Sequence, residues 1–126
     1  MPKPFDIRQR AFQFACEIVA AFPAGRPLAP PAWRTWSQLI AAGTSIGAHL
    51  EEADAASSRT HFITLNRGAL REAREARYWL RLISATRLTG HDHVGTLEHE
   101  ADELVAILST IVRNASRPRP AAPDER

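Results

Sequence analysis

The sequence predicts an all-α protein, an antiparallel four-helix bundle with up-down-up-down topology. All nine prolines lie outside four long segments or at their edges, and proline costs about 3 kcal/mol inside a helix. Apolar residues recur every three or four positions within each segment, which gives each helix one apolar face. The links at 57–59 and 89–91 are short, and short links make neighbouring helices run antiparallel.

The first helix is expected at about 5–22, with Asp6 as its N-cap. Cys16 lies between apolar positions of this helix, and we expect it to be a small buried core residue. The apolar positions recur with heptad spacing and are expected to face the core: Phe5, Phe12, Ala15, Val19 and Phe22.

The second helix is expected at about 31–56, with Pro31 in its first turn, where proline is favoured. Its predicted core stripe is Trp36, Leu39, Gly43, Ile46, Leu50 and Ala53. Trp33 lies in the first turn, where it could cap the open end of the bundle, and Trp79 borders the core stripe of the third helix. Core or interface packing explains the three tryptophans better than nucleotide stacking does.

The third helix is expected at about 59–88, after a cap at Ser58 or Thr60 and before a stop at Gly90. Its predicted core stripe is Phe62, Leu65, Ala69, Ala73, Ala76, Leu80 and Ile83. Small residues would let the second and third helices approach closely: Ala42, Gly43, Gly47, Ala69, Ala73 and Ala76.

The fourth helix is expected at about 92–115. Its predicted core stripe is Val94, Leu97, Ala101, Leu104, Leu108 and Ile111. We expect 1–116 to form one domain, and the polar, proline-rich residues 117–126 to be disordered.

The composition excludes several classes of protein. One cysteine cannot form an internal disulfide. The N-terminus lacks an apolar signal core, and no apolar run approaches the roughly 20 residues of a membrane span, so we expect a cytoplasmic protein. No serine elbow, phosphate loop or CxxC pair is present, so we expect neither an enzyme nor a cofactor.

The third helix carries seven arginines and two acids. At about 100° of rotation per residue, five of the arginines form a band roughly opposite the core, which we call the arginine face. These are Arg67, Arg71, Arg74, Arg77 and Arg81. Such a band suits phosphate contacts with RNA or DNA. Two alternatives stay open: a solvated face partly neutralised by nearby acids, and a salt-bridge surface between subunits.

Apolar residues accompany these arginines on the outward side of the third helix. Ile63, Leu70 and Tyr78 lie in the same sector, and Leu82 lies nearby. Apolar groups among arginines suit a protein interface better than a solvated surface, which favours an oligomer.

A metal site is a weaker alternative. Di-iron bundles use glutamates together with Glu-x-x-His motifs, and this chain has no Glu-x-x-His. We expect polar contacts near the core, and no metal, from His49, Glu52 and Glu72. A solvated, acidic helix start explains the cluster His91, His93 and His99.

Residues 32–83 also contain an ordered set that matches a known family. The set is Gln38, Leu39, Thr44, Ser45, Ile46, Glu52, Ser58, Phe62, Ala69, Glu72 and the run Glu75, Ala76, Arg77, Tyr78, Trp79, Leu80. With these residues the chain resembles the bacterial four-helix-bundle proteins of the 23S rRNA-intervening sequence family. His49 stands where that family often has asparagine.

The resemblance implies a non-enzymatic bundle that assembles, since pentameric rings are known among its relatives. A related branch serves as the accessory protein of diversity-generating retroelements, where a basic barrel binds nucleic acid and a reverse transcriptase. We therefore expect a homo-oligomeric ring, with a pentamer favoured, that acts as a nucleic-acid-binding or reverse-transcriptase-accessory adaptor. The alternative is a structural oligomer with a protein partner and no affinity for nucleic acid.

Overall fold

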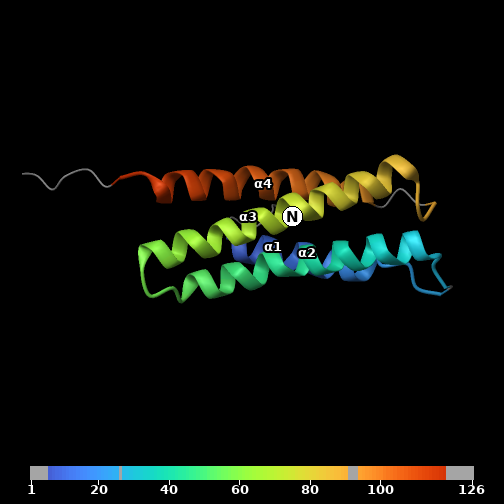
Figure 1. The fold of residues 1–126 in the computed structure, drawn as a ribbon, viewed down its shortest axis with the longest axis horizontal. Helices are drawn as coiled ribbons and strands as arrows, with labels where there is room; N and C mark the ends of the chain where they lie inside the picture. Colours follow the sequence, from blue (N-terminus) through green and yellow to red (C-terminus); the bar gives the residue numbers. More distant parts are fainter. Residues whose placement is uncertain (1–5, 26, 91–93, 119–126) are drawn as a thin grey trace, which may run out of the picture.

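The computed structural model describes residues 6–25, 27–90 and 94–118, which form four helices and no strand (Figure 1). The helices are α1 (Ile7–Ala21), α2 (Pro30–Asp54), α3 (Arg59–Thr86) and α4 (Val94–Ser116). α2 packs against α3, α3 packs against α4, and α1 contacts both α2 and α4. These contacts confirm the predicted all-α four-helix bundle.

Two helix starts carry the predicted caps. The Asp6 carboxylate accepts a hydrogen bond from the backbone N–H of Arg8 at 2.9 Å. The Ser58 hydroxyl oxygen accepts one from the backbone N–H of His61 at 3.1 Å, so Ser58, and not Thr60, caps α3. Each cap satisfies a backbone donor that the first turn of a helix leaves without a partner.

The end of α3 differs from the prediction. The residue that takes the left-handed conformation directly after the helix is Arg87, with φ 49° and ψ 42°. Its backbone N–H bonds to the carbonyl oxygens of Ile83 and Ser84, as expected for a left-handed cap. Gly90 also has a positive φ of 73°, but three residues later.

Replacing Arg87 by glycine is expected to raise the free energy of unfolding by about 0.5–1 kcal/mol, because glycine adopts positive φ without steric cost. The matched variant Arg87→Ala removes the same charge and keeps the strain, so it should gain nothing. Urea denaturation of both variants checks this, and a less stable Arg87→Gly variant would contradict it.

The core follows the predicted stripes on three of the helices. Every predicted stripe residue of α2 is buried, and so are those of α3 except Phe62, which is exposed. On α4 the stripe is buried from Val94 to Leu108, and Ile111 is half-buried. Trp36 is fully buried in this core.

The predicted core face of α1 is wrong at Phe12 and Val19, whereas Ala15 and Phe22 are half-buried and Phe22 packs against the core. Phe12 and Val19 are 63% and 55% exposed, and Cys16 is exposed as well. Phe5 lies outside the described residues. The residues of α1 that enter the core are instead Ala11, Phe14 and Ile18.

Glycines on α2 explain why α1 turns this way. A Cβ built on Gly43 would overlap with the Cδ1 atom of Ile18. A Cβ on Gly47 would lie 3.7 Å from that of Ala11. The sequence suggested that these glycines bring α2 close to α3, but their open sides receive α1.

A second contact of α1, not predicted from the sequence, ties the helix to α4. Arg10 donates from Nε and Nη2 to the two carboxylate oxygens of Glu100, at 3.3 and 2.5 Å, and from Nη2 to Glu103 at 2.7 Å. The hydrogen bond to Glu100 raises the pKa of Arg10, against the opposing effect of burial. A pKa that is higher in the folded chain means that folding stabilises the charged guanidinium of Arg10. The contact therefore contributes to the stability of the fold at all lower pH values, and this stabilisation is lost only as the pH rises through the pKa of the folded state.

Candidate nucleic-acid interface

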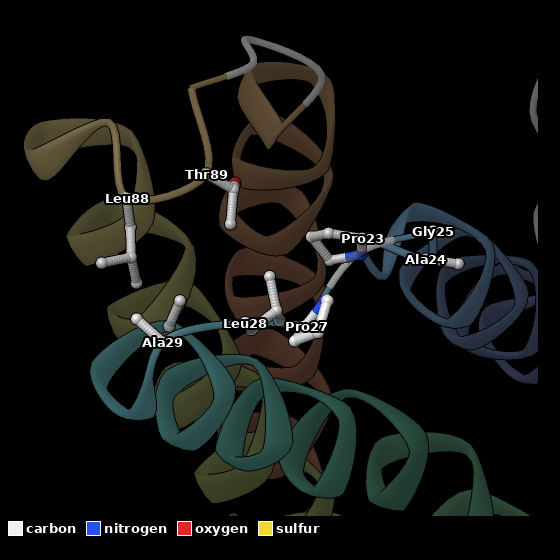
Figure 2. Close-up of a pocket in the computed structure, with 9 residues that line it drawn as sticks. Pro23, Ala24, Gly25, Pro27, Leu28, Ala29, Leu88 and Thr89 are labelled. Atoms are coloured by element: carbon white, nitrogen blue, oxygen red, sulfur yellow. The ribbon is translucent and has the colours of Figure 1, made fainter.

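An open cavity lies at the end of the bundle where α1 is joined to α2 and α3 ends. It encloses about 670 Å³ and is lined by Pro23, Ala24, Gly25, Pro27, Leu28, Ala29, Ala32, Leu88 and Thr89. Figure 2 shows these side chains, which come from the α1–α2 connection, the first turn of α2 and the segment after α3. None of these lining residues is titratable, so they provide no acid or base.

A neighbouring cavity of about 440 Å³ contains one carboxylate, that of Glu17, among its described lining residues. Trp36 also lines it, and its buried Nε1 has no hydrogen-bond partner among the residues that the structure describes. One exposed carboxylate beside an indole does not form the paired acid and base that hydrolytic chemistry uses.

Nucleophilic side chains are not activated within the described parts of the chain. The threonine and serine hydroxyls that donate hydrogen bonds there donate them to backbone carbonyls, as Thr44 does to Ile40 at 2.8 Å. Cys16 is exposed and makes no hydrogen bond to a histidine or carboxylate in the part of the chain that the structure describes. No described serine, threonine or cysteine therefore has the neighbouring base that nucleophilic catalysis requires.

Of the three residues predicted to make polar contacts near the core, two are half-buried and one is exposed. His49 of α2 is half-buried against α3, where a Cβ on Gly68 would lie 3.0 Å from the ring. Glu72 is half-buried, with Arg71 of its own helix 3.9 Å away. The prediction for Glu52 is wrong, because Glu52 is exposed and its neighbours Leu50 and Ala53 take the inward positions.

Within 6–25, 27–90 and 94–118, no group of three His, Cys, Asp or Glu residues is placed to hold a metal ion. His99 lies 3.8 Å from Glu103, one turn away on α4. His91 and His93 lie outside the described residues.

The arginine face divides into three parts. Arg67, Arg71 and Arg74 border an open cleft of about 330 Å³ between α3 and α4, which we call the α3/α4 cleft. Arg77 is half-buried and lies 3.5 Å from Asp102 of α4, so its charge is partly neutralised. Arg81 is exposed further along α3.

The α3/α4 cleft has an apolar floor beneath its charged rim. Leu70 and Val112 are its remaining lining residues. Arg67 also reaches across the cleft, with its Nη2 atom 3.4 Å from the hydroxyl oxygen of Ser116. A charged rim over an apolar floor can bind a ligand that presents both anionic and apolar groups.

The surroundings of the α3/α4 cleft are positively charged. Residues 59–71 of α3, and residues 104–118 at and just after the end of α4, contain five arginines and no aspartate or glutamate, while Glu72 lies 3.9 Å from Arg71. Arg59 ties the two segments together, donating to the carbonyl oxygens of Ala115 and Arg117, each at 2.5 Å. A local excess of fixed positive charge attracts polyanions.

Only part of the interface predicted on α3 is exposed on the surface of the bundle. Tyr78 is 58% exposed, while Ile63 and Leu82 are half-buried. The prediction for Leu70 is wrong, because Leu70 is 8% exposed and lies at the bottom of the α3/α4 cleft. The angular position of Leu70 around α3 predicted that its side chain faces away from the core. In the structure, however, α4 packs over that side of α3.

The structure reveals a different apolar surface on α1. Phe12, Cys16 and Val19 are exposed at helical spacings of four and three residues, and we call them the α1 outer face. Sequence reasoning missed this surface because the same heptad pattern was assigned to the core. The second apolar set on α1, which contains Phe14 and Ile18, was the signal that could have revealed it.

None of the described helices is long and apolar enough to cross a membrane.

Known proteins resemble this chain in sequence and in fold. No curated protein matches it. One similar solved structure is the 1.70 Å crystal structure of a protein with unknown function from the S23 ribosomal protein family of Bacteroides thetaiotaomicron VPI-5482. Its TM-score is 0.73 and its sequence identity to this chain is 27%. The match covers 86% of this chain and 99% of that one. The sequence profile of the 23S rRNA-intervening sequence protein matches residues 3–110. The chain therefore belongs to the 23S rRNA-intervening sequence protein family.

Proposed function

We propose that this protein is a non-catalytic, cytoplasmic, homo-oligomeric bundle that binds nucleic acid through the outward side of α3, alone or as an adaptor for a nucleic-acid enzyme such as a reverse transcriptase. The observation that carries the proposal is the group of exposed arginines around the α3/α4 cleft, which outnumber the one acid, Glu72, that lies close to Arg71. Exposed arginines give phosphate contacts that do not depend on sequence.

The arginines that would contact nucleic acid are those without an acidic partner on another helix. Arg67, Arg71, Arg74 and Arg81 are exposed, and their only ionic contact among the described residues is the 3.9 Å approach of Arg71 to Glu72. Arg77 contributes less, because Asp102 already partly neutralises it.

Binding of a labelled RNA at low and at moderate salt tests this function. We expect binding at low salt that weakens as the salt concentration rises, because bound phosphates release counterions. A chain that retains no RNA or DNA even at low salt would contradict the proposal.

Self-association is the second part of the proposal, and a pentameric ring is the form that we favour. The α1 outer face supports it, because large apolar side chains on an otherwise polar surface are typical of interfaces. This face belongs to a different helix from the arginine face.

Replacing Phe12 by glutamate is expected to shift the chain from oligomer to monomer, because burying a charge in an apolar contact carries a desolvation cost. Gln13→Glu is the matched control, since Gln13 is the exposed neighbour outside the apolar set. Light scattering measures the mass of each variant. Thiol labelling of Cys16 gives a second measurement: it should be slow in the oligomer and fast in the Phe12→Glu monomer.

The alternative function is a structural oligomer with a protein partner and no affinity for nucleic acid. The exposed apolar residues of α1 favour it, since they could equally contact another protein. An oligomer by light scattering that binds no RNA at low salt would select this alternative.

A further inference from the structure

We infer that the arginine face binds single-stranded nucleic acid in preference to a duplex, with Tyr78 as the surface on which an unpaired base stacks. This inference rests on the proposed function, since it specifies which kind of nucleic acid the same surface takes. Three observations support it: the position of Tyr78, its contact with Trp79 and the apolar floor of the α3/α4 cleft.

Tyr78 is an exposed aromatic residue within a row of arginines. It is 58% exposed, and it lies four residues after Arg74 and three residues before Arg81 on α3. Residues at these spacings are neighbours on the surface of a helix. The Tyr78 hydroxyl forms no hydrogen bond within the described part of the chain, so no polar contact inside the bundle accounts for its position.

The ring of Tyr78 is supported from one side. It packs edge-to-face on Trp79, with ring centroids 5.1 Å apart and an interplanar angle of 75°. Trp79 is itself held, because its Nε1–H donates to the Glu75 carboxylate at 3.3 Å. An aromatic ring that is already ordered loses less entropy when a ligand stacks on it.

The charges next to this ring are available for phosphates. Arg74 and Arg81 are exposed and form no ion pair with any described residue. Single-strand sites combine a basic groove that follows the backbone with aromatic side chains that stack on the bases. In a duplex the bases are already stacked on each other, so Tyr78 would add little and only the arginines would contribute.

The α3/α4 cleft provides a second apolar surface on the same side of α3. Its floor consists of Leu70 and Val112, and its rim consists of Arg67, Arg71 and Arg74. An unpaired base can place its apolar face against such a floor while its phosphate contacts the rim. The phosphate backbone of a duplex presents no comparable apolar group.

The test compares fluorescein-labelled oligouridylate with an RNA duplex of equal length, using the full chain and fluorescence anisotropy. Tyr78→Ala is expected to weaken single-strand binding by about tenfold and to leave duplex binding unchanged. Tyr78→Phe keeps the ring and should bind like the wild type. Trp33→Ala is the matched control, because Trp33 is equally exposed but lies on α2; it should not change either affinity.

The outcomes separate this inference from the proposed function. If oligouridylate and duplex both bind but Tyr78→Ala changes neither, or if the wild type prefers the duplex, the inference is wrong and the proposed function stands. If neither RNA binds and single- and double-stranded DNA of the same length do not bind either, both are wrong. If Tyr78→Ala instead lowers the mass in light scattering, Tyr78 belongs to a subunit contact and the inference is overturned.

Discussion

Replacing Phe14 by alanine is expected to lower the free energy of unfolding by about 3–5 kcal/mol, whereas Phe12→Ala should change it by less than about 0.5 kcal/mol. Phe14 is 1% exposed and belongs to the core, while Phe12 is 63% exposed. The two residues carry the same side chain on the same helix, so the difference measures only the direction in which α1 faces.

Guanidinium denaturation of both variants makes this comparison. It should be run at a protein concentration low enough to dissociate oligomers, because association adds apparent stability. If Phe12→Ala were the more damaging change under those conditions, the heptad face predicted from the sequence would be the buried one. The orientation of α1 in the bundle would then be wrong.

Removing four arginines together is expected to have the largest effect on function. The variant Arg67→Ala, Arg71→Ala, Arg74→Ala and Arg81→Ala should lower affinity for RNA by about a hundredfold or more at low salt. All four side chains are exposed, and alanine favours helix, so the fold should persist. Circular dichroism confirms that the variant is folded, and filter binding measures its affinity.

Unchanged binding by this fourfold variant would remove the arginine face from the proposal. Binding could then still occur elsewhere, for example near Arg113 and Arg117 at the end of α4. The proposal that α3 carries the site would have to be abandoned.

The sequence was sufficient for three of the helices because each offers one apolar stripe. On α2, the stripe from Trp36 to Ala53 has no competitor, and burial follows it residue by residue. Capping was equally readable, because Asp6 and Ser58 stand directly before long helical segments. Local patterns of this kind depend on few distant contacts.

The sequence could not orient α1, because two apolar sets of similar spacing compete on it. One contains Phe12 and Val19, and the other contains Phe14 and Ile18. The choice depends on where α2 has room, and Gly43 receives Ile18. Such a fit between helices is a tertiary property that the spacing within one helix does not contain.

The candidate site was predictable in composition and not in geometry. The exposed arginines of α3 were identified correctly as outward-facing, but their unequal surroundings depend on α4. That helix pairs Asp102 with Arg77 and covers Leu70. The contact of Arg10 with Glu100 joins residues 90 positions apart, and no local pattern indicates it.

The salt dependence of single-stranded RNA binding tests the central claim most directly. The measurement compares the wild type with two variants that remove the same amount of charge: the pair Arg74→Ala and Arg81→Ala, and the pair Arg34→Ala and Arg87→Ala. All four of these arginines are exposed, but only the first pair lies on the arginine face.

The plot of log affinity against log salt concentration has a negative slope. This slope should become less steep by about 0.7 for each phosphate that the protein no longer neutralises, and hence by about 1.4 for the first pair. The second pair should keep the wild-type slope. Equal slopes for all three proteins, or an equal decrease in both variants, would show that the arginine face is not where nucleic acid binds.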